Sequence, residues 1–230
     1  MQIVTLSPKY PCCDGYDNKH RKGSVSMKLK IIIVLLIAAL AHFSNPLIAM
    51  ADEFYVETGG SDENDGSEAS PWGTIQGAID NSAVENGDTI NVGSGTFTEN
   101  IAVNKSVKIY GEETGKPVIT AEDSSDNVFR ISANSVEIKN LVIKGAGGSE
   151  AAGVYVNSNI DDCSVSYCEL SDNEYGIYLD NTDDAVVYEN EFKDNHRGAY
   201  LYKADKSKIT YNEFKDNTVG IYLVKSEIGY

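Results

Sequence analysis

The chain has 230 residues, of which 35 are acidic and 19 basic, so its formal net charge is −16. An excess of carboxylates of this size repels phosphate backbones, and we therefore expect no binding of nucleic acid. The same charge predicts good solubility and weak attraction for cations.

Residues 1–51 carry the signs of an export signal. We expect residues 1–26, which lack hydrophobic periodicity, to be unstructured or to result from a start codon placed too far upstream, with Met27 as the favoured start. Segment 27–51 has lysines at 28 and 30, eleven apolar residues at 31–41 and the motif Ala49-Met50-Ala51, which is typical of a cleaved signal peptide. The apolar run is shorter than the roughly 20 residues of a membrane helix. We therefore expect no stable membrane span after cleavage and a secreted, extracellular or cell-surface protein.

Residues 52–87 are expected to form a leader and a short N-terminal cap. Residues 52–72 are rich in Gly, Ser and Asp, which favours loops. The segment Thr74–Ala83 that follows places Ile75, Ala78, Ile79 and Ala83 on one side of a helix. A short amphipathic helix ahead of repeated units is suited to covering the first of them.

Residues 88–230 are predicted to be short strands separated by turns. Ahead of the repeats, alternating apolar residues predict strands at 89–92, 97–103, 107–110, 118–120, 128–132 and 136–143.

Residues 161–226 consist of three consecutive copies of 22 residues, namely 161–182, 183–204 and 205–226. A fixed period of this length predicts a solenoid, in which each unit buries its apolar face against the next. No copy has the L-x-x-L-x-L pattern of leucine-rich repeats, whereas segments such as Gly176-Ile177-Tyr178-Leu179 alternate with a period of two. Three short strands and three turns per copy predict an all-β fold, a right-handed parallel β-helix with coils about 4.8 Å apart.

Stacking of the coils would turn equivalent positions of the copies into rows of side chains. The Asp-Asn pairs and the glycine at position 176 and its equivalents are expected at turns, because these residues tolerate turn dihedrals. Asparagines are expected to hydrogen-bond along the axis, and leucines to fill a dry core. The expected rows are Asn173, Asn195 and Asn217; Cys168, Asn190 and Asn212; and Leu179, Leu201 and Leu223.

Only Glu227–Tyr230 follow the third copy. An uncapped last coil would expose a strand edge and an apolar end. We therefore expect the β-helix of residues 88–230 to be C-terminally truncated.

Several motifs resemble those of known exported proteins. Asn64-Asp65-Gly66-Ser67, Pro71-Trp72 and Gly95-Thr96-Phe97-Thr98-Glu99-Asn100-Ile101 resemble the opening of secreted proteins of the pectin lyase-like superfamily. The later Asn-x-Phe-x-x-Asn and Gly-Ile-Tyr-Leu units are similar to repeats of NosD-type copper-maturation accessory proteins and of microbial surface proteins. The resemblance covers residues 55–230 and implies a parallel β-helix. It leaves the activity open, because the superfamily holds lyases, hydrolases, epimerases and non-enzymes.

Aspartates one coil apart are candidate metal ligands or catalysts. Asp161, Asp183 and Asp205 could bind calcium, which takes about six to eight oxygens. Together with Asp184 they could instead supply the acid and base of a glycosidase. Turn formation by aspartate explains the same positions without any site. Arg197 is the candidate base of a lyase, because lyases of the resembled superfamily often use Arg or Lys.

Four tyrosines on successive coils are the candidate carbohydrate-binding residues. Their rings are expected to form a flat exposed strip on which sugar rings stack. Packing of the rings on one another explains the same row without a ligand. The four are Tyr155, Tyr178, Tyr200 and Tyr222.

Residues 52–230 offer little for copper or for disulfide formation. They hold one histidine, His196, and no methionine, so direct copper binding is not expected. Cys163 and Cys168 are expected to be buried free thiols, because residues five apart on consecutive strands need not meet disulfide geometry. No cofactor is expected beyond the calcium considered above.

The sequence therefore predicts an exported β-helix that acts as a structural or carbohydrate-binding module. Its expected partners are polysaccharides or components of the cell envelope. Two alternatives stay open. One is a polysaccharide lyase or glycoside hydrolase acting on acidic glycans, and the other is a NosD-like accessory protein.

Overall fold

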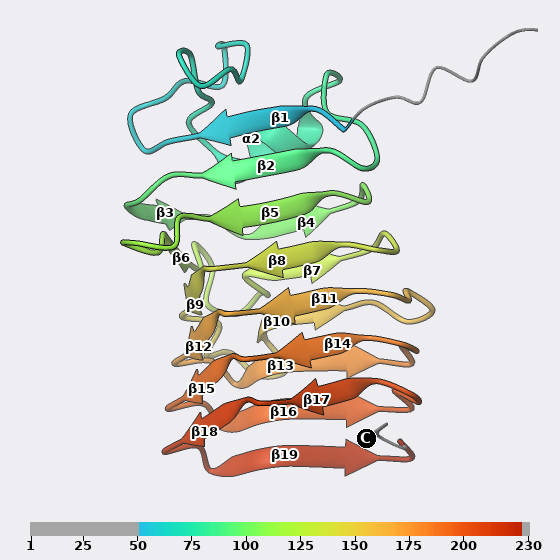
Figure 1. Ribbon diagram of the computed structural model, residues 1–230. Helices are drawn as coiled ribbons and strands as arrows, with labels where there is room; N and C mark the ends of the chain where they lie inside the picture. Colours follow the sequence, from blue (N-terminus) through green and yellow to red (C-terminus); the bar gives the residue numbers. More distant parts are fainter. Residues whose placement is uncertain (1–50, 227–230) are drawn as a thin grey trace, which may run out of the picture. The chain divides into compact units, whose positions relative to one another are not determined.

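The computed structural model describes residues 51–226, which form a stack of parallel β-coils (Figure 1). Residues 1–26 and all of the expected signal peptide except Ala51 lie outside the described residues. Within residues 51–226, no helix is long and apolar enough to cross a membrane.

Three parallel sheets build the stack. Each full coil contributes one strand to sheet 1, one to sheet 2 and one to sheet 3 before the chain passes to the next coil. In Figure 1 the strands of sheet 1 run to the left in front and those of sheet 3 run to the right behind, while the chain descends. The coil is therefore right-handed, and the predicted right-handed parallel β-helix is confirmed.

Most strands are three to six residues long. Sheet 1 contains β1 (Glu53–Val56), β2 (Thr89–Val92), β5 (Lys108–Gly111), β8 (Glu137–Lys139), β11 (Ser164–Ser166), β14 (Val186–Tyr188) and β17 (Lys208–Thr210). Sheet 2 contains β3 (Thr96–Thr98), β6 (Val118–Thr120), β9 (Val142–Lys144), β12 (Glu169–Ser171), β15 (Glu191–Lys193) and β18 (Glu213–Lys215). Sheet 3 contains β4 (Ile101–Val103), β7 (Phe129–Ile131), β10 (Ala152–Val156), β13 (Tyr175–Asp180), β16 (Arg197–Tyr202) and β19 (Val219–Val224).

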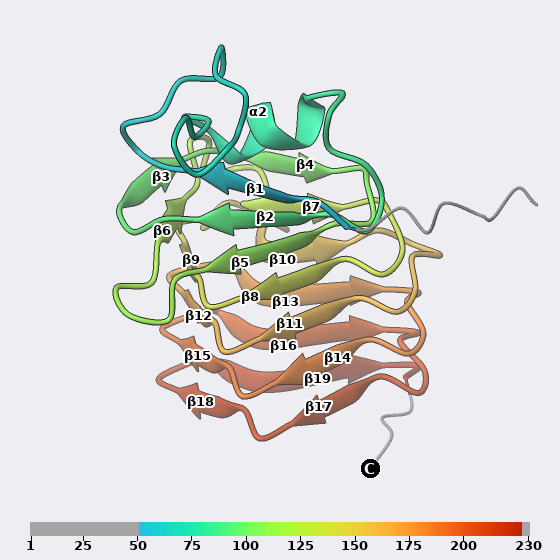
Figure 2. The same cartoon turned by 45° about the horizontal axis from the view of Figure 1, so that its top comes forward.

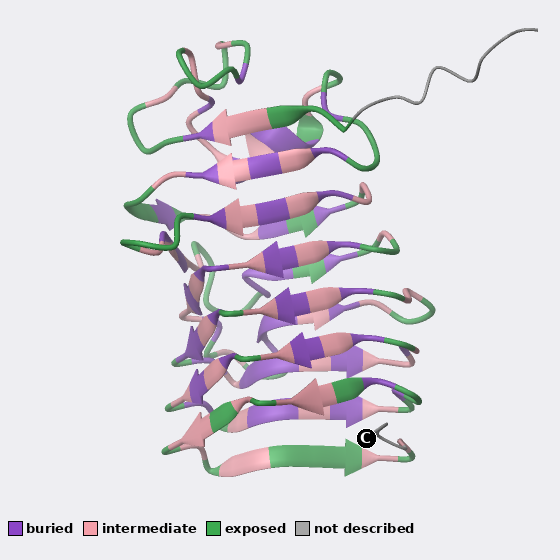
Figure 3. Cartoon of the chain, viewed as in Figure 1, coloured by how far each residue is buried: buried purple, intermediate pink, exposed green. Residues whose placement is uncertain are grey.

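The predicted leucine row lies in register along sheet 3. Leu179 pairs with Leu201, and Leu201 pairs with Leu223. The row continues toward the N-terminus through Val156 and Ile131. Inward residues of this kind form one buried core along the axis, seen as purple segments in Figure 3.

Both asparagine rows form buried ladders of hydrogen bonds. Asn173 donates from its backbone N–H and its Nδ2 to Oδ1 of Asn195, at 3.0 and 3.1 Å. Asn195 donates in the same way to Asn217, at 3.0 Å for both bonds. Because these bonds satisfy polar groups at the corners of the coil, they fix the register of each corner. The second row makes equivalent bonds among Cys168, Asn190 and Asn212.

Two of the predicted strands are wrong, because the chain bends within each segment and forms two shorter strands that belong to different sheets. Segment 97–103 divides into β3 and β4, and segment 136–143 divides into β8 and β9. The first corner lies at Glu99 and Asn100, where the Asn100 side chain donates to the Asn127 carbonyl at 2.8 Å. The second lies at Asn140, whose φ is +58°. Apolar residues keep pointing inward on both sides of a corner, so alternation alone cannot show where the chain bends.

The predicted N-terminal helix is present but shorter than expected. α2 (Ile75–Asp80) begins after Thr74, whose hydroxyl accepts the Gly77 N–H at 2.9 Å, and ends where Asn81 becomes extended. Ala83 is therefore outside the helix and exposed. α2 lies against β4, β1 and β2 (Figure 2). Its role as a cap stays a prediction.

The glycine row does not lie at turns. Gly176, Gly198 and Gly220 lie inside β13, β16 and β19, and none is among the residues with positive φ. The turns are made instead by the aspartates before the asparagine ladder, since Asp172 and Asp194 have φ of +57° and +54°. The row is glycine because a Cβ on Gly176 would lie 2.5 Å from the Gly198 carbonyl oxygen.

The coil at the C-terminal end of the described residues is more open than the others. Leu223 is 44% exposed, whereas its neighbour Leu201 in the same row is fully buried. The other side chains of β19 follow this trend (Figure 3).

Candidate functional site

The four predicted tyrosines form one row on the outer surface of sheet 3, named here the tyrosine face: Tyr155, Tyr178, Tyr200 and Tyr222. Neighbouring ring centroids are 5.0, 4.6 and 5.4 Å apart along the row. The expected flat strip is wrong, because the first two ring pairs meet at 88° and 74° and only Tyr200 and Tyr222 are stacked, at 9°. The rings therefore pack partly on one another and partly face outward.

Tyr175 belongs to the same surface, although the sequence did not predict it. Its ring lies 5.3 Å from that of Tyr178 and 5.2 Å from that of Tyr200. The alternation of inward and outward residues is interrupted at Gly176 and Ile177, which are both buried. Tyr175 is itself largely buried, at 9% exposed, so it packs beneath the other rings of the face, whereas Tyr178 is half-buried.

Two arginines lie over the rings of the tyrosine face. The guanidinium of Arg197 is 5.2, 5.8 and 5.3 Å from the ring centroids of Tyr175, Tyr200 and Tyr222. Arg130 lies 5.3 Å from the centroid of Tyr155. These are distances at which cations are attracted by the ring electrons. The face therefore combines aromatic surface with positive charge on a strongly acidic protein.

Arg197 is the centre of a small polar cluster. Its Nη1 donates to Oε1 of Glu174 at 3.2 Å, and Nδ1 of His196 lies 2.7 Å from the same oxygen. The Nε of Arg197 is buried and has no hydrogen-bond partner among the described residues. Glu174 thus fixes one end of the guanidinium while the rings hold its faces.

Burial raises the pKa values of tyrosines on this face. For Tyr178, desolvation is the main cause, followed by the charge of Asp180. For Tyr155, desolvation again comes first and a hydrogen bond from the hydroxyl to Asp180, of 3.0 Å, adds to it. The hydroxyl of Tyr178 therefore stays protonated near neutral pH and can donate to a ligand, whereas the hydroxyl proton of Tyr155 is already donated to Asp180.

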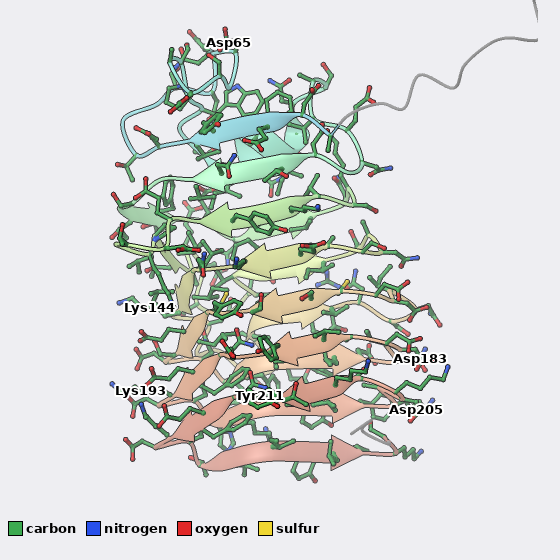
Figure 4. All side chains as sticks on the ribbon, viewed as in Figure 1. Asp65, Lys144, Asp183, Lys193, Asp205 and Tyr211 are labelled. Atoms are coloured by element: carbon green, nitrogen blue, oxygen red, sulfur yellow. The ribbon has the colours of Figure 1, made fainter. Side chains whose placement is uncertain are left out.

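The aspartate column lies at a different corner of the coil. Figure 4 places Asp183 above Asp205, on successive turns at one edge. With Asp161 they line a shallow depression of about 310 Å³. Oδ1 of Asp161 accepts the backbone N–H of Asp183 at 2.9 Å, and Asp184 has φ of +57°. These are roles of turn residues, and residues 51–226 contain no cluster of three His, Cys, Asp or Glu placed to hold a metal.

The structure does not bring Arg197 to the aspartates. Arg197 is the first residue of β16, and Asp205 follows the end of the same strand. A strand of six residues is about 20 Å long. The candidate base and the candidate carboxylates therefore lie at opposite edges of sheet 3.

Cys163 and Cys168, the cysteines of residues 51–226, are free and buried, as the sequence predicted. Burial raises the pKa of the Cys168 thiol to about 11, and the same cause raises that of Cys163 to about 11. Thiols of this kind are poor nucleophiles and poor metal ligands at neutral pH.

Comparison with known proteins identifies the family. A family profile described as periplasmic copper-binding protein (NosD) matches residues 75–229. The chain belongs to the NosD family. Over 92 residues this NosD-family chain is 36% identical to a cell surface glycoprotein from Methanothermus fervidus, an alignment that covers 40% of the chain and 14% of the glycoprotein.

Solved structures share the fold of the NosD-family chain. An alginate lyase from Paenibacillus sp. str. FPU-7 has a TM-score of 0.55 at 13% identity, covering 78% of this chain and 58% of the lyase. A pectate lyase has a TM-score of 0.53 at 16% identity, covering 73% of this chain and 50% of the pectate lyase. A lacto-N-biosidase from Eubacterium ramulus has a TM-score of 0.55 at 13% identity, covering 81% of this chain and 47% of the biosidase. The chain spans about half the length of these proteins, and at such identities the likeness shows the fold alone.

The described part of this NosD-family chain does not fit a copper site. Copper prefers imidazole, thioether and thiolate donors. Residues 51–226 offer one histidine, which is bonded to Glu174, no methionine, and two buried thiols of raised pKa. Nor do three potential ligands cluster anywhere in this range. The family description and the donor set of these residues therefore disagree.

Proposed function

We propose that the chain is an exported β-helix of the cell surface or envelope, which binds polysaccharide through the tyrosine face. The observation that carries the proposal is the row of four tyrosines in register on one sheet, with Arg130 and Arg197 over the rings. Aromatic faces stack on the C–H groups of sugar rings, while hydroxyls and guanidinium groups supply donors.

Similarity to known proteins supports the location. The NosD family is described as periplasmic, and the relative from Methanothermus fervidus is described as a cell surface glycoprotein. Both descriptions place the related protein outside the cytoplasm, in agreement with the export signal expected at residues 27–51.

The alternatives receive less support from the geometry. A glycoside hydrolase needs two carboxylates at one bond of the substrate, and in the aspartate column the carboxylate of Asp161 already accepts the backbone N–H of Asp183. A lyase needs its base beside the carboxylates that would hold a substrate-bound cation. Among the described residues, Arg197 and the aspartate column lie at opposite edges of sheet 3. A NosD-like accessory role would have to depend on a partner surface, because the described residues offer no fitting copper ligands.

The test is glycan binding by a variant with both central rings replaced, Tyr178→Leu and Tyr200→Leu. Leucine keeps much of the apolar packing while it removes the aromatic faces and hydroxyls. We expect at least a tenfold loss of affinity on a glycan array, with an unchanged circular dichroism spectrum. Tyr202→Ala is the matched control, since Tyr202 lies on β16 outside the row. Equal binding by the double variant and the wild type would refute the proposal.

A further inference from the structure

A second group of tyrosines lies where sheet 1 turns into sheet 2. The group, named here the corner tyrosines, consists of Tyr167, Tyr188 and Tyr211. The ring of Tyr188 lies 5.8 Å from that of Tyr167 and 5.5 Å from that of Tyr211, and both pairs meet edge to face. Tyr211 is 81% exposed and Tyr167 is 37% exposed. Solvent therefore reaches these rings more freely than it reaches the central rings of the tyrosine face.

Two of the corner tyrosines have an unfavourable backbone. Tyr167 and Tyr211 have φ of +56° and +59°, a region that bulky side chains rarely occupy. The equivalent position of an earlier coil is Asn140, a residue type that tolerates this conformation. The same conformation occurs at Glu189, the equivalent residue of the copy between them, so positive φ is a property of this corner and not of the tyrosines alone.

Tyr211, the most exposed of the corner tyrosines, borders a hollow in the surface. The hollow has a volume of about 280 Å³ and is lined by Tyr211, Lys116, Glu169, Glu189, Glu191 and Glu213, among others. Nζ of Lys116 donates to the Tyr167 carbonyl at 2.6 Å, so the loop before β6 is tied to this corner. Figure 4 shows Tyr211 on the front of the lower coils, away from the edge with Asp183 and Asp205.

Glutamates set the charge of the hollow. Glu169 pairs with Glu191, and Glu191 with Glu213, on successive strands of sheet 2. Lys215 offsets part of this charge, with Nζ 2.9 Å from Glu191 and 3.0 Å from Glu213. Lys139 adds a third cation, 5.2 Å from the ring centroid of Tyr167, so four carboxylates against three lysines leave the site slightly negative. Carboxylates accept hydrogen bonds from sugar hydroxyls and from amines, and they repel uronate and sulfate groups.

We propose that the corner tyrosines and the adjoining hollow bind a glycan without acidic groups, and that amino sugars bind best. The rings supply the stacking surface, and the glutamates accept hydrogen bonds from hydroxyl and ammonium groups. This site is separate from the tyrosine face, which lies on sheet 3, and it does not depend on the function proposed above.

The test compares three hexasaccharide probes of different charge by isothermal titration calorimetry on the full exported chain. The probes are hexamers of glucosamine, N-acetylglucosamine and galacturonic acid. At this corner we expect the glucosamine hexamer to bind most tightly, the N-acetylglucosamine hexamer more weakly, and the galacturonate hexamer not at all. Any binding of the galacturonate hexamer at the tyrosine face should therefore be unchanged by Tyr211→Ala. Raising the salt concentration should weaken binding of the glucosamine hexamer more than binding of the N-acetylglucosamine hexamer, because only the glucosamine hexamer carries charge.

Variants place the binding at this corner. Tyr211→Ala should weaken binding of the glucosamine hexamer by roughly tenfold, and its high exposure means that the fold should not change. Glu191→Gln should reduce the preference for glucosamine over N-acetylglucosamine. Tyr202→Ala, on β16 and outside both groups of tyrosines, is the control and should leave binding of this probe intact. The proposal is overturned if Tyr211→Ala has no effect on binding of the glucosamine hexamer, if it weakens binding of the galacturonate hexamer to the same extent, or if no probe binds.

Discussion

The rings of Phe192 and Phe214 lie parallel on successive coils, with centroids 4.8 Å apart and an angle of 7° between their planes. They lie directly against the glycine row of sheet 3. A Cβ on Gly176 would be 2.7 Å from Cδ1 of Phe192, and a Cβ on Gly198 would be 2.6 Å from Cδ1 of Phe214. The two phenylalanines and the glycines that face them, Gly176 and Gly198, therefore form one packing unit that recurs on two successive coils.

Gly198→Ala is expected to destabilise the fold by roughly 1–3 kcal/mol, the usual range for overpacking a core. Its Cβ would also lie 2.7 Å from the Gly220 carbonyl oxygen, which cannot move without disturbing the sheet. Gly220→Ala is the matched control, because its nearest contact would be an ordinary 3.8 Å. Urea unfolding measures the free energy of unfolding of each variant, and equal values for Gly198→Ala and Gly220→Ala would contradict this account.

Asn195→Leu is expected to lower the free energy of unfolding by about 2–5 kcal/mol, because two buried polar groups lose their partners. These are the backbone N–H of Asn173 and the carbonyl of Leu170, which accepts from Nδ2 of Asn195 at 2.8 Å. The control is Asn181→Gly, since Asn181 donates to Asn159 at the surface and its φ is +49°. We expect the control to change stability by no more than about 0.5 kcal/mol. A ladder substitution that is as mild as the surface one would show that the ladder adds little stability.

The two thiols predict a specific loss of stability in alkali. Burial raises each thiol pKa from its ordinary value of 9.0 to about 11. A raised pKa favours the folded state fully below pH 9, and this contribution disappears as the pH rises from 9 to 11. Replacing both with alanine, Cys163→Ala and Cys168→Ala, should therefore reduce the fall in unfolding midpoint across that interval. Tyrosine titration is common to both proteins, so identical pH profiles would rule out a thiol contribution.

Arg197→Met is expected to lower stability by about 1–2 kcal/mol, since it removes a cation held by three rings and by Glu174. Lys203→Met is the control. The ammonium of Lys203 lies 5.2 Å from one ring, that of Tyr202, at an exposed position, and the expected change is close to zero. Thermal unfolding of both variants checks the difference. An effect of Arg197→Met as small as that of Lys203→Met would contradict a stabilising role of the guanidinium.

The 22-residue period made the stacked rows predictable. Residues such as Leu179 and Asn195 recur unchanged or nearly so in each copy, and parallel pairing then places them in line. The corners at Asn100 and Asn140 were not predictable from alternation, because the chain bends between strands while its apolar residues keep facing the core. The glycine row was misinterpreted for a related reason, since the sequence shows the missing Cβ but not the ring that lies against it.

The candidate surfaces were predictable only in part. The tyrosine face followed from the alignment of the copies, but Tyr175 was missed because alternation is interrupted at Gly176. The corner tyrosines are hidden in the alignment, since Tyr188 is offset by one position from Tyr167 and Tyr211, and the aligned residue of its own copy is Glu189. The three rings meet in space although Tyr188 does not occupy the same position in its copy as Tyr167 and Tyr211 do in theirs.

The equal length of the last three copies has a consequence for how such a protein can change in size. Removing residues 183–204, or inserting a second copy of them, would subtract or add one whole coil and bring equivalent strands together on either side of the junction. Gains and losses of one 22-residue unit should therefore be tolerated, whereas a change of a few residues within a strand would put every later row out of line. The cross-section is fixed by the repeat, and the length along the axis can vary in steps of about 4.8 Å.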